Sequence, residues 1–140
     1  MAESAPCVFC RIVEGEIPCF KLHEDPRTLA FMDINPFHDG HCLVITKAHA
    51  ENLYAADEAD LAAAIAVAKR LAIAVNQVLR PDGINLVQAN GAGAGQSVFH
   101  FHFHVFPRKL NDNAQFNWGH KPGDMARIGE LAERIKRAMP

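Results

Sequence analysis

Three histidines alternate with apolar residues in one short stretch of the C-terminal third. His100, His102 and His104 are each followed by a phenylalanine or a valine. Because successive side chains of a β-strand point to opposite faces, this pattern predicts a strand over residues 98–106 with the histidines on one face. The other face is expected to pack into the core and consists of Phe99, Phe101, Phe103 and Val105.

The rise of a strand limits what these histidines can do together. At about 3.3 Å per residue, the Cα atoms of His100 and His104 lie about 13 Å apart. A zinc ion binds histidine nitrogens at about 2.0–2.1 Å, so one ion cannot take all three side chains. This geometry disfavours a zinc hydrolase that uses the whole row as ligands. The three histidines are therefore expected to have different roles.

A glycine-rich segment, residues 90–97, precedes the histidines. Gly91, Gly93 and Gly95 permit positive φ angles and close backbone approach, so N–H groups of this loop are expected to face an anion such as a phosphate. Histidine has an ordinary pKa of about 6.5 and is mostly neutral at pH 7, so it can attack phosphorus without first losing a proton. The hypothesis is a phosphate site beside a nucleophilic imidazole.

This segment resembles the signature of the histidine-triad (HIT) nucleotide-binding family. The resemblance lies in residues 95–105, GQSVFHFHFHV, and continues in family order through residues 7–12, 30–36 and 40–45, Lys47 and His49. It implies an α+β fold in which an antiparallel sheet of about five strands carries one long helix and a C-terminal helix. The short strands joined mostly by turns predict the same class directly.

The hydrophobic pattern places the elements. Short strands are expected near residues 19–23, 29–32, 41–45, 84–88 and 98–106, after a helical turn at residues 7–12. A long helix is predicted over residues 57–79 and a closing helix over residues 124–139. No linker or repeat divides the chain, so residues 1–140 are expected to form a single domain. The stripes expected to face the core are Leu61, Ile65, Ala68, Ala72, Val75 and Leu79 in the first helix and Met125, Ile128, Leu131 and Ile135 in the second.

Composition narrows the class of partner. The net charge is −2, which gives no electrostatic footprint for DNA, an RNA polymer or an anionic membrane. No apolar run approaches the roughly 18–20 residues of a membrane span, and the acidic residues 1–6 do not resemble a secretory signal. The chain is therefore expected in the cytoplasm, where its four cysteines would be reduced thiols or metal ligands.

The family resemblance implies a set of catalytic residues. His102 matches the histidine that attacks the α-phosphorus of a nucleotide and forms a covalent nucleotidyl-imidazole, which water then resolves. In the family a backbone carbonyl sets the tautomer of this histidine. His104 matches a supporting histidine near the phosphate, and His41 matches one behind it. Ser97 and Gln96 align with residues that contact the phosphate and the leaving group, although both are also ordinary loop residues.

The resemblance also implies a nucleotide-binding pocket. Asp33, followed by Ile34, matches the position that binds the ribose, where a carboxylate can accept protons from both hydroxyls of a cis-diol. Asn90 matches a polar residue of the same pocket. A purine is the implied base, whereas the choice between adenine and guanine stays open, because apolar walls stack on a base without reading its hydrogen bonds. The wall positions match Phe9, Ile12, Ile17, Ile34 and Leu43.

Cys7 and Cys10 form a Cys-x-x-Cys pair, which in a cytoplasmic chain suggests zinc or redox exchange. A redox pair normally follows a strand of a βαβ unit, and only the short residues 1–6 precede this one, so zinc fits better. A closed tetrahedral site needs two more ligands. The resemblance supplies His49 and His100 and implies a structural ion. Cys19 and Cys42 are expected to be buried thiols.

Two classes of function follow. The first is an enzyme, a purine nucleotide phosphoramidase or nucleotidyl hydrolase acting on AMP or GMP conjugates without a catalytic metal; a dinucleoside polyphosphate hydrolase is the alternative within this class. The second is a nucleotide-binding interaction module without significant catalysis. The resemblance also implies a homodimer packed across the long helix and a strand. The tail with Phe116, Trp118 and His120 matches the family poorly, which leaves the leaving group open.

Overall fold

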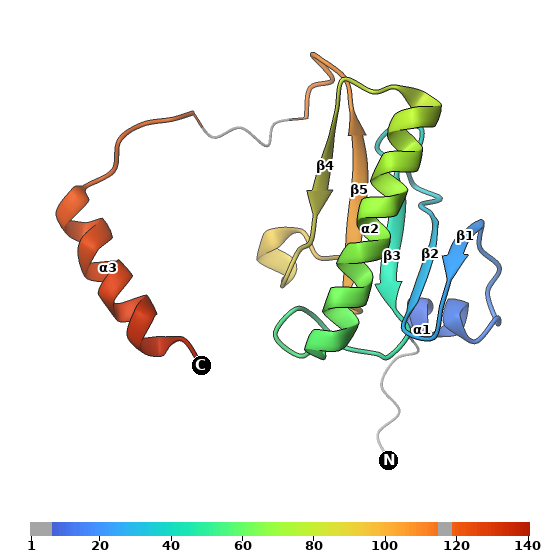
Figure 1. Ribbon diagram of the computed structural model, residues 1–140, viewed down its shortest axis with the longest axis horizontal. Helices are drawn as coiled ribbons and strands as arrows, with labels where there is room; N and C mark the ends of the chain where they lie inside the picture. The colour runs from blue at the N-terminus through green and yellow to red at the C-terminus, as the bar shows by residue number, and fades with distance from the viewer. Residues whose placement is uncertain (1–6, 115–118) are drawn as a thin grey trace.

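The structure is a computed structural model that describes residues 7–114 and 119–140, so Phe116 and Trp118 of the tail lie outside it. Its centre is a five-stranded antiparallel sheet with the order β1-β2-β3-β5-β4, and helix α2 crosses one face (Figure 1). The predicted α+β class, with one long helix and a C-terminal helix, is confirmed. The elements are α1 (Val8–Val13), β1 (Lys21–Glu24), β2 (Thr28–Met32), β3 (Cys42–Thr46), α2 (Glu58–Leu79), β4 (Gly83–Val87), the 3₁₀ turn η1 (Ala92–Ala94), β5 (His102–Arg108) and α3 (Met125–Ala138).

Strand β3 is the middle of the sheet, and all five of its residues are buried. It pairs with β2 on one side and β5 on the other. In the β3–β5 register Leu43 faces His104 and Ile45 faces His102. Because facing residues of an antiparallel pair share a face, both histidines lie on the same side of the sheet as these two apolar residues. The predicted alternation is confirmed for His102 and His104.

Each face of the sheet carries its own apolar cluster. The face toward α2 buries Phe101 beside Val44 and Ala30, and the opposite face packs against Phe9 of α1. The histidines of β5 therefore lie on the face that α1 covers. The buried members of the α2 cluster are Ala30, Val44, Ala64, Val67, Ala68 and Phe101, and those of the α1 cluster are Phe9, Leu29, Phe31, Leu43 and Ile45.

Strand β5 begins four residues later than the sequence pattern predicts. Phe101 and Val105 are fully buried as expected and Phe103 packs against the same cluster, but Phe99 is 43% exposed. The segment before β5 does not continue the sheet, because the N–H of Phe101 donates to the carbonyl of Ala50 in the loop after β3. His100 is fully buried in this irregular segment rather than in the strand.

Helix α2 is rotated relative to the predicted stripe. It begins after Asp57, which accepts a hydrogen bond from the N–H of Ala59 at 2.7 Å. Its buried residues are Ala64, Val67 and Ala68, whereas Ile65 and Leu79, both predicted to face the core, are 44% and 43% exposed. The two alanines let the helix axis approach the sheet, and larger side chains on the same face would hold it off.

The length and composition of α2 bear on the expectation that no segment resembles a membrane span. Within the described part of the chain, α2 is the one helix long and apolar enough to cross a membrane, although it is not an uninterrupted apolar run. Length and composition are weak criteria, since the core helix of a domain also meets them. Here one side of α2 packs against the sheet and contributes to the core.

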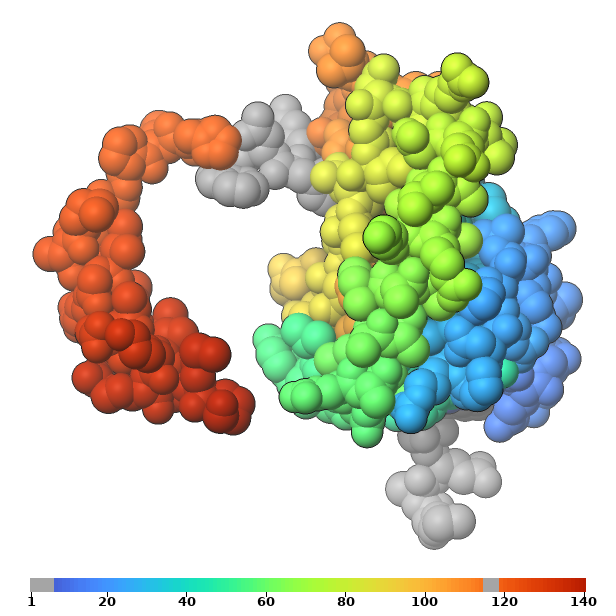
Figure 2. All heavy atoms as spheres, in the orientation of Figure 1, coloured from blue at the N-terminus to red at the C-terminus, as the bar shows by residue number. Residues whose placement is uncertain are grey.

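Helix α3 forms where the sequence predicts it, after the cap Asp124. Its predicted inward packing is wrong: no residue of α3 is buried, and Met125, Ile128 and Ile135 are 77%, 49% and 62% exposed. Figures 1 and 2 show α3 standing apart from the sheet, beyond the β4 edge. Amphipathic periodicity identifies a helix with an apolar stripe, but it does not say which surface covers that stripe.

Replacing Phe101 by alanine should lower the free energy of unfolding by about 3–5 kcal/mol, because a fully buried aromatic ring is lost from the α2 cluster. Urea unfolding followed by circular dichroism measures the change. Phe20→Ala is the matched control, since that ring is 70% exposed and its loss should cost less than about 0.5 kcal/mol. Equal effects of the two substitutions would contradict the assigned core.

Candidate active site and metal cluster

A cavity of about 430 Å³ opens on the face of the sheet that carries the histidines. Its size is that of a small-molecule pocket. Most of the predicted site residues line it, namely Phe9, Ile12, Ile17, Asp33, Ile34, His41, Leu43, Ser97, His102 and His104. The prediction missed Val8, Pro18, Cys19, Phe31, Met32, Asn35 and Val98, all of which are neighbours in sequence of predicted residues or belong to the same short segments.

His102 is held with one nitrogen committed and the other available. Its Nδ1 lies 2.6 Å from the carbonyl oxygen of His100, and a carbonyl can only accept, so Nδ1 carries the proton. The neutral imidazole then has its lone pair on Nε2. The ring is 6% exposed, lines the cavity and contacts the edge of Phe9, with ring centroids 5.1 Å apart. The structure thus contains the carbonyl contact that the family resemblance implies.

A second chain of hydrogen bonds fixes the tautomers of His41 and His104. The backbone N–H of Phe37 donates to Nδ1 of His41 at 3.0 Å, so the proton of neutral His41 is on Nε2. That Nε2–H donates to Nδ1 of His104 at 2.9 Å, which leaves the proton of His104 on its own Nε2. His104 therefore presents a donor to the cavity where His102 presents an acceptor.

Burial keeps these imidazoles neutral. Desolvation lowers the pKa of His102 and of His41, and in His41 the nearby Asp33 partly opposes it. The pKa of His104 falls to about 4, because burial is reinforced by the neighbouring His102 and His41. At neutral pH the cavity therefore holds an unprotonated Nε2 on His102 and a neutral donor on His104.

Asp33 lies at the mouth of the cavity beside the histidine pair. One carboxylate oxygen accepts the N–H of Asn35 at 2.8 Å, and the other is 3.4 Å from Nε2 of His41. Ile34 is 76% exposed and lines the same cavity. A carboxylate with one oxygen turned toward the cavity can accept hydrogen bonds from hydroxyl groups of a ligand.

The glycine loop differs from the predicted phosphate cradle. Gly91 and Gly95 do adopt positive φ angles, 90° and 87°. The N–H groups of residues 91, 94, 95 and 96, however, all donate to acceptors within the loop itself. These four groups close the turn around η1 instead of facing an anion.

Gln96 and Asn90 do not line the cavity. The Gln96 amide accepts from the N–H of Gly91 and donates to the carbonyls of Glu51 and Val98. Asn90 accepts from the N–H of Leu53. In this structure both side chains hold the loop, while Ser97, exposed at its end, lies on the cavity wall. A side-chain amide can bind a ligand or hold a loop, and the sequence could not separate the two roles.

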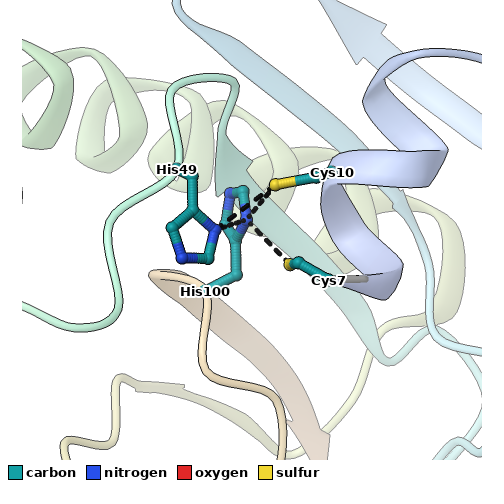
Figure 3. A group of neighbouring side chains, drawn as sticks. All are labelled: Cys7, Cys10, His49 and His100. Carbon is teal, nitrogen blue, oxygen red and sulfur yellow. Dashed lines mark hydrogen bonds between the residues drawn. The ribbon is translucent and has the colours of Figure 1, made fainter. Parts of the chain in front are cut away.

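Cys7, Cys10, His49 and His100 come together in a cluster (Figure 3), and the ring of Phe9 contacts that of His100. The Nε2–H of His100 donates to the carbonyl of Thr46 at 2.6 Å, so its Nδ1 lone pair faces the cluster. That Nδ1 lies 3.4 Å from Sγ of Cys7, 3.5 Å from Sγ of Cys10 and 3.2 Å from Nδ1 of His49. Nδ1 of His49 is 3.3 Å from Sγ of Cys10.

These distances match a zinc tetrahedron. Zinc–sulfur bonds of about 2.3 Å and zinc–nitrogen bonds of about 2.0–2.1 Å give edges of about 3.5 Å between sulfur and nitrogen and about 3.4 Å between two nitrogens. The donor set, two thiols and two imidazoles, is also one that zinc prefers. Burial and the Cys7 sulfur raise the pKa of Cys10 to about 11, so an ion must displace a proton from this thiol.

The remaining cysteines are free thiols with different surroundings. Cys42 is fully buried in β3, as predicted, and burial raises its pKa to about 11. Cys19 is only partly buried and lines the cavity, which corrects the expectation of a core thiol.

Comparison with curated relatives shows strong similarity over most of the chain. An uncharacterized HIT-like protein of Borreliella burgdorferi is 45% identical over 92% of this chain and 95% of its own length. A Candida albicans protein named adenosine 5′-monophosphoramidase is 36% identical over 99% and 95%. An Arabidopsis thaliana protein named adenylylsulfatase is 42% identical over 76% of this chain and 54% of its own length.

Solved structures have the same fold. A HIT family protein of Bacillus anthracis superposes with a TM-score of 0.90 at 33% identity, covering 99% of this chain and 100% of that one. A zinc-bound histidine triad protein of Mycobacterium smegmatis gives a TM-score of 0.73 at 36% identity, covering 95% and 97%. The family model described as the HIT domain matches residues 14–111. The cavity, its histidines and these similarities lead to one conclusion: the chain belongs to the HIT domain family.

Proposed function

We propose that this protein is a hydrolase of nucleotide conjugates that cleaves the bond between the α-phosphorus of a purine nucleoside 5′-phosphate and an amine. The observation that carries the proposal is the orientation of His102, whose Nδ1 is bound to a carbonyl and whose Nε2 lone pair is free at the cavity. Relatives named adenosine 5′-monophosphoramidase and adenylylsulfatase support the class, because both names describe cleavage at a nucleotide phosphate.

The reaction proceeds in two displacements at phosphorus. In the first, Nε2 of His102 forms a bond to the α-phosphorus while the phosphorus–nitrogen bond of the substrate breaks, and the amine departs with the electron pair of that bond and a proton taken from solvent. In the second, water attacks the same phosphorus and gives up a proton to solvent, the bond to Nε2 breaks with its electron pair returning to the imidazole, and the nucleoside monophosphate is released. Splitting one difficult displacement into two is the general advantage of a covalent intermediate.

The contacts around His102 suit each stage of this reaction. Attack places a positive charge on the imidazole, and the Nδ1–H donated to the His100 carbonyl becomes a charge-assisted hydrogen bond at that moment. His104 lies beside it, with ring centroids 4.8 Å apart, and directs its Nε2–H toward the reacting phosphate or the departing amine. Hydrogen-bond donors fixed where negative charge develops are an effective source of rate acceleration.

The residues that line the cavity support a proposed position for each part of the nucleotide. The base lies among the side chains of Phe9, Ile12 and Leu43, and the ribose hydroxyls donate to Asp33. The α-phosphate then reaches Ser97 and the two histidines of β5. In this proposal zinc in the Cys7 cluster is structural, and the chemistry it supplies is the cross-linking of α1 to the segment before β5.

We also propose that the chain is a single domain, that it forms a homodimer and that it acts in the cytoplasm. Strand β4 lies at an edge of the sheet, and α2 next to it exposes Ile65, Ile73 and Val78. An exposed sheet edge beside an apolar helix face is a surface that a second copy can cover. Four cysteines present as free thiols agree with a reducing compartment.

His102→Ala should abolish AMP release from adenosine phosphoramidate, with kcat/KM reduced by at least about 10³-fold, since the nucleophile is gone. Release is measured by chromatography, and folding by circular dichroism. His23→Ala is the matched control, because His23 pairs with Asp25 away from the cavity, and it should retain full turnover. Binding of AMP without any turnover by the wild type would instead favour the interaction module, and turnover of dinucleoside polyphosphates alone would change the substrate class.

The imidazole of His104 should stay neutral from pH 8 down to about pH 5.5, because burial disfavours its charged form and places its pKa at about 4. The Cε1–H resonance in NMR spectra, assigned with a His104→Gln spectrum, reports the protonation state. The resonance should begin to move only below this range. A midpoint near the ordinary histidine value of about 6.5 would show that the ring is solvated and would contradict the assigned donor arrangement.

Ile73→Asp should weaken the homodimer, raising its dissociation constant by at least about tenfold, because it places a carboxylate on the exposed apolar face of α2. Sedimentation velocity over a concentration series measures the constant. Tyr54→Asp, at a residue 84% exposed outside α2, should leave the dimer unchanged. A wild-type protein that is monomeric at every concentration would exclude the dimer.

A further inference from the structure

Helix α1 connects the metal cluster to the cavity. Cys7, the residue before its first turn, and Cys10 bring two sulfur atoms to the cluster, and between them Val8 and Phe9 contribute to the cavity wall. The helix has only six residues, and an isolated helix of this length is not stable in water. Its position therefore depends on the contacts that its side chains make with the rest of the domain.

Phe9 is the side chain through which α1 reaches the nucleophile. It is 7% exposed, and its ring lies edge-on to three others, with centroids 5.1 Å from His102, 5.9 Å from His100 and 5.6 Å from Phe31. One ring thus touches the proposed nucleophile, a cluster ligand and the core of the sheet. A movement of α1 would change the wall of the cavity and the packing of His102 together.

His100, in contrast, is anchored without the help of an ion. Its Nε2–H donates to the carbonyl of Thr46, and the next residue, Phe101, donates its N–H to the carbonyl of Ala50. The carbonyl that orients His102 therefore has its own supports in the loop after β3. Two connections therefore lead from the cluster to His102, one through His100 and its carbonyl and the other through α1 and Phe9. Only the second depends on the cysteines.

We propose that metal in the Cys7–Cys10–His49–His100 cluster raises the affinity of the cavity for nucleotide by holding Phe9 against His102. The inference rests on the proposed function, because it takes the cavity as the nucleotide site. Metal bound by all four ligands fixes α1, so nucleotide binding no longer has to order it. Coupling between two sites is reciprocal, and nucleotide therefore raises the metal affinity by the same factor.

The test measures AMP binding to the full chain by isothermal titration calorimetry, with stoichiometric zinc and after zinc removal. We expect the dissociation constant of AMP to be at least about fivefold higher without zinc, the lower end of usual coupling between sites. Phe9→Ala should bind AMP more weakly and equally in both states, whereas the control Phe20→Ala, at an exposed phenylalanine, should keep the wild-type ratio. If Phe9→Ala does not fold, Phe9→Leu replaces it and should reduce the ratio.

Each other outcome has a defined meaning. Equal AMP affinity with and without zinc would overturn the coupling while leaving the proposed function intact. A folded, zinc-loaded protein that does not bind AMP would overturn the proposed function instead. A wild-type ratio in the Phe9 variant would exclude Phe9 as the connection. Loss of the cooperative melting transition on zinc removal would also overturn the inference, since zinc would then hold the whole domain and not α1.

Discussion

The hydrogen bond from Nδ1 of His102 to the carbonyl of His100 is the contact on which the site depends. It selects one tautomer, aims the Nε2 lone pair at the cavity and leaves a partner in place for the charge that attack would create. The carbonyl is available because the chain leaves the sheet before His102, where Phe101 binds Ala50. A regular strand through residues 98–106 would have used that carbonyl in a ladder. The irregularity before β5 is therefore what allows a strand histidine to present its Nε2 lone pair to the cavity.

Four histidines around the cavity and the cluster present different nitrogens because each imidazole has a different fixed partner. His100 donates to a carbonyl and faces the cluster with its lone pair, and His102 donates to a carbonyl and faces the cavity with its own. In His41 the Nδ1 atom accepts a backbone N–H, so its Nε2–H is the donor to His104. The backbone sets the tautomers of His41, His100 and His102 directly, and that of His104 through His41.

Much of this arrangement could be predicted from the sequence, and the features that could not be predicted have physical reasons. The alternation around His102 and His104 predicted their shared face. The Cys-x-x-Cys pair predicted a metal site, and the family resemblance implied His49 and His100 as the other ligands of the cluster that the structure brings together. Periodicity could not show that the chain leaves the sheet at Phe99, because an apolar residue is compatible with either course. Periodicity also could not show which side of α2 faces the sheet, where Ala64 and Ala68 let the helix pack closer to the sheet than Ile65 would allow. Gln96 and Asn90 were assigned to the ligand because an amide that binds backbone groups looks the same in sequence as one that binds substrate.

Helix α3 occupies about one tenth of the chain, yet it contributes no residue to the cavity, to the metal cluster or to either apolar cluster among the described residues. Substitutions in it are expected to leave the packing that orients His102 unchanged. The apolar stripe of α3 has no core to fill among the described residues. Substitutions in this stripe would therefore report on contacts outside the domain and not on its folding.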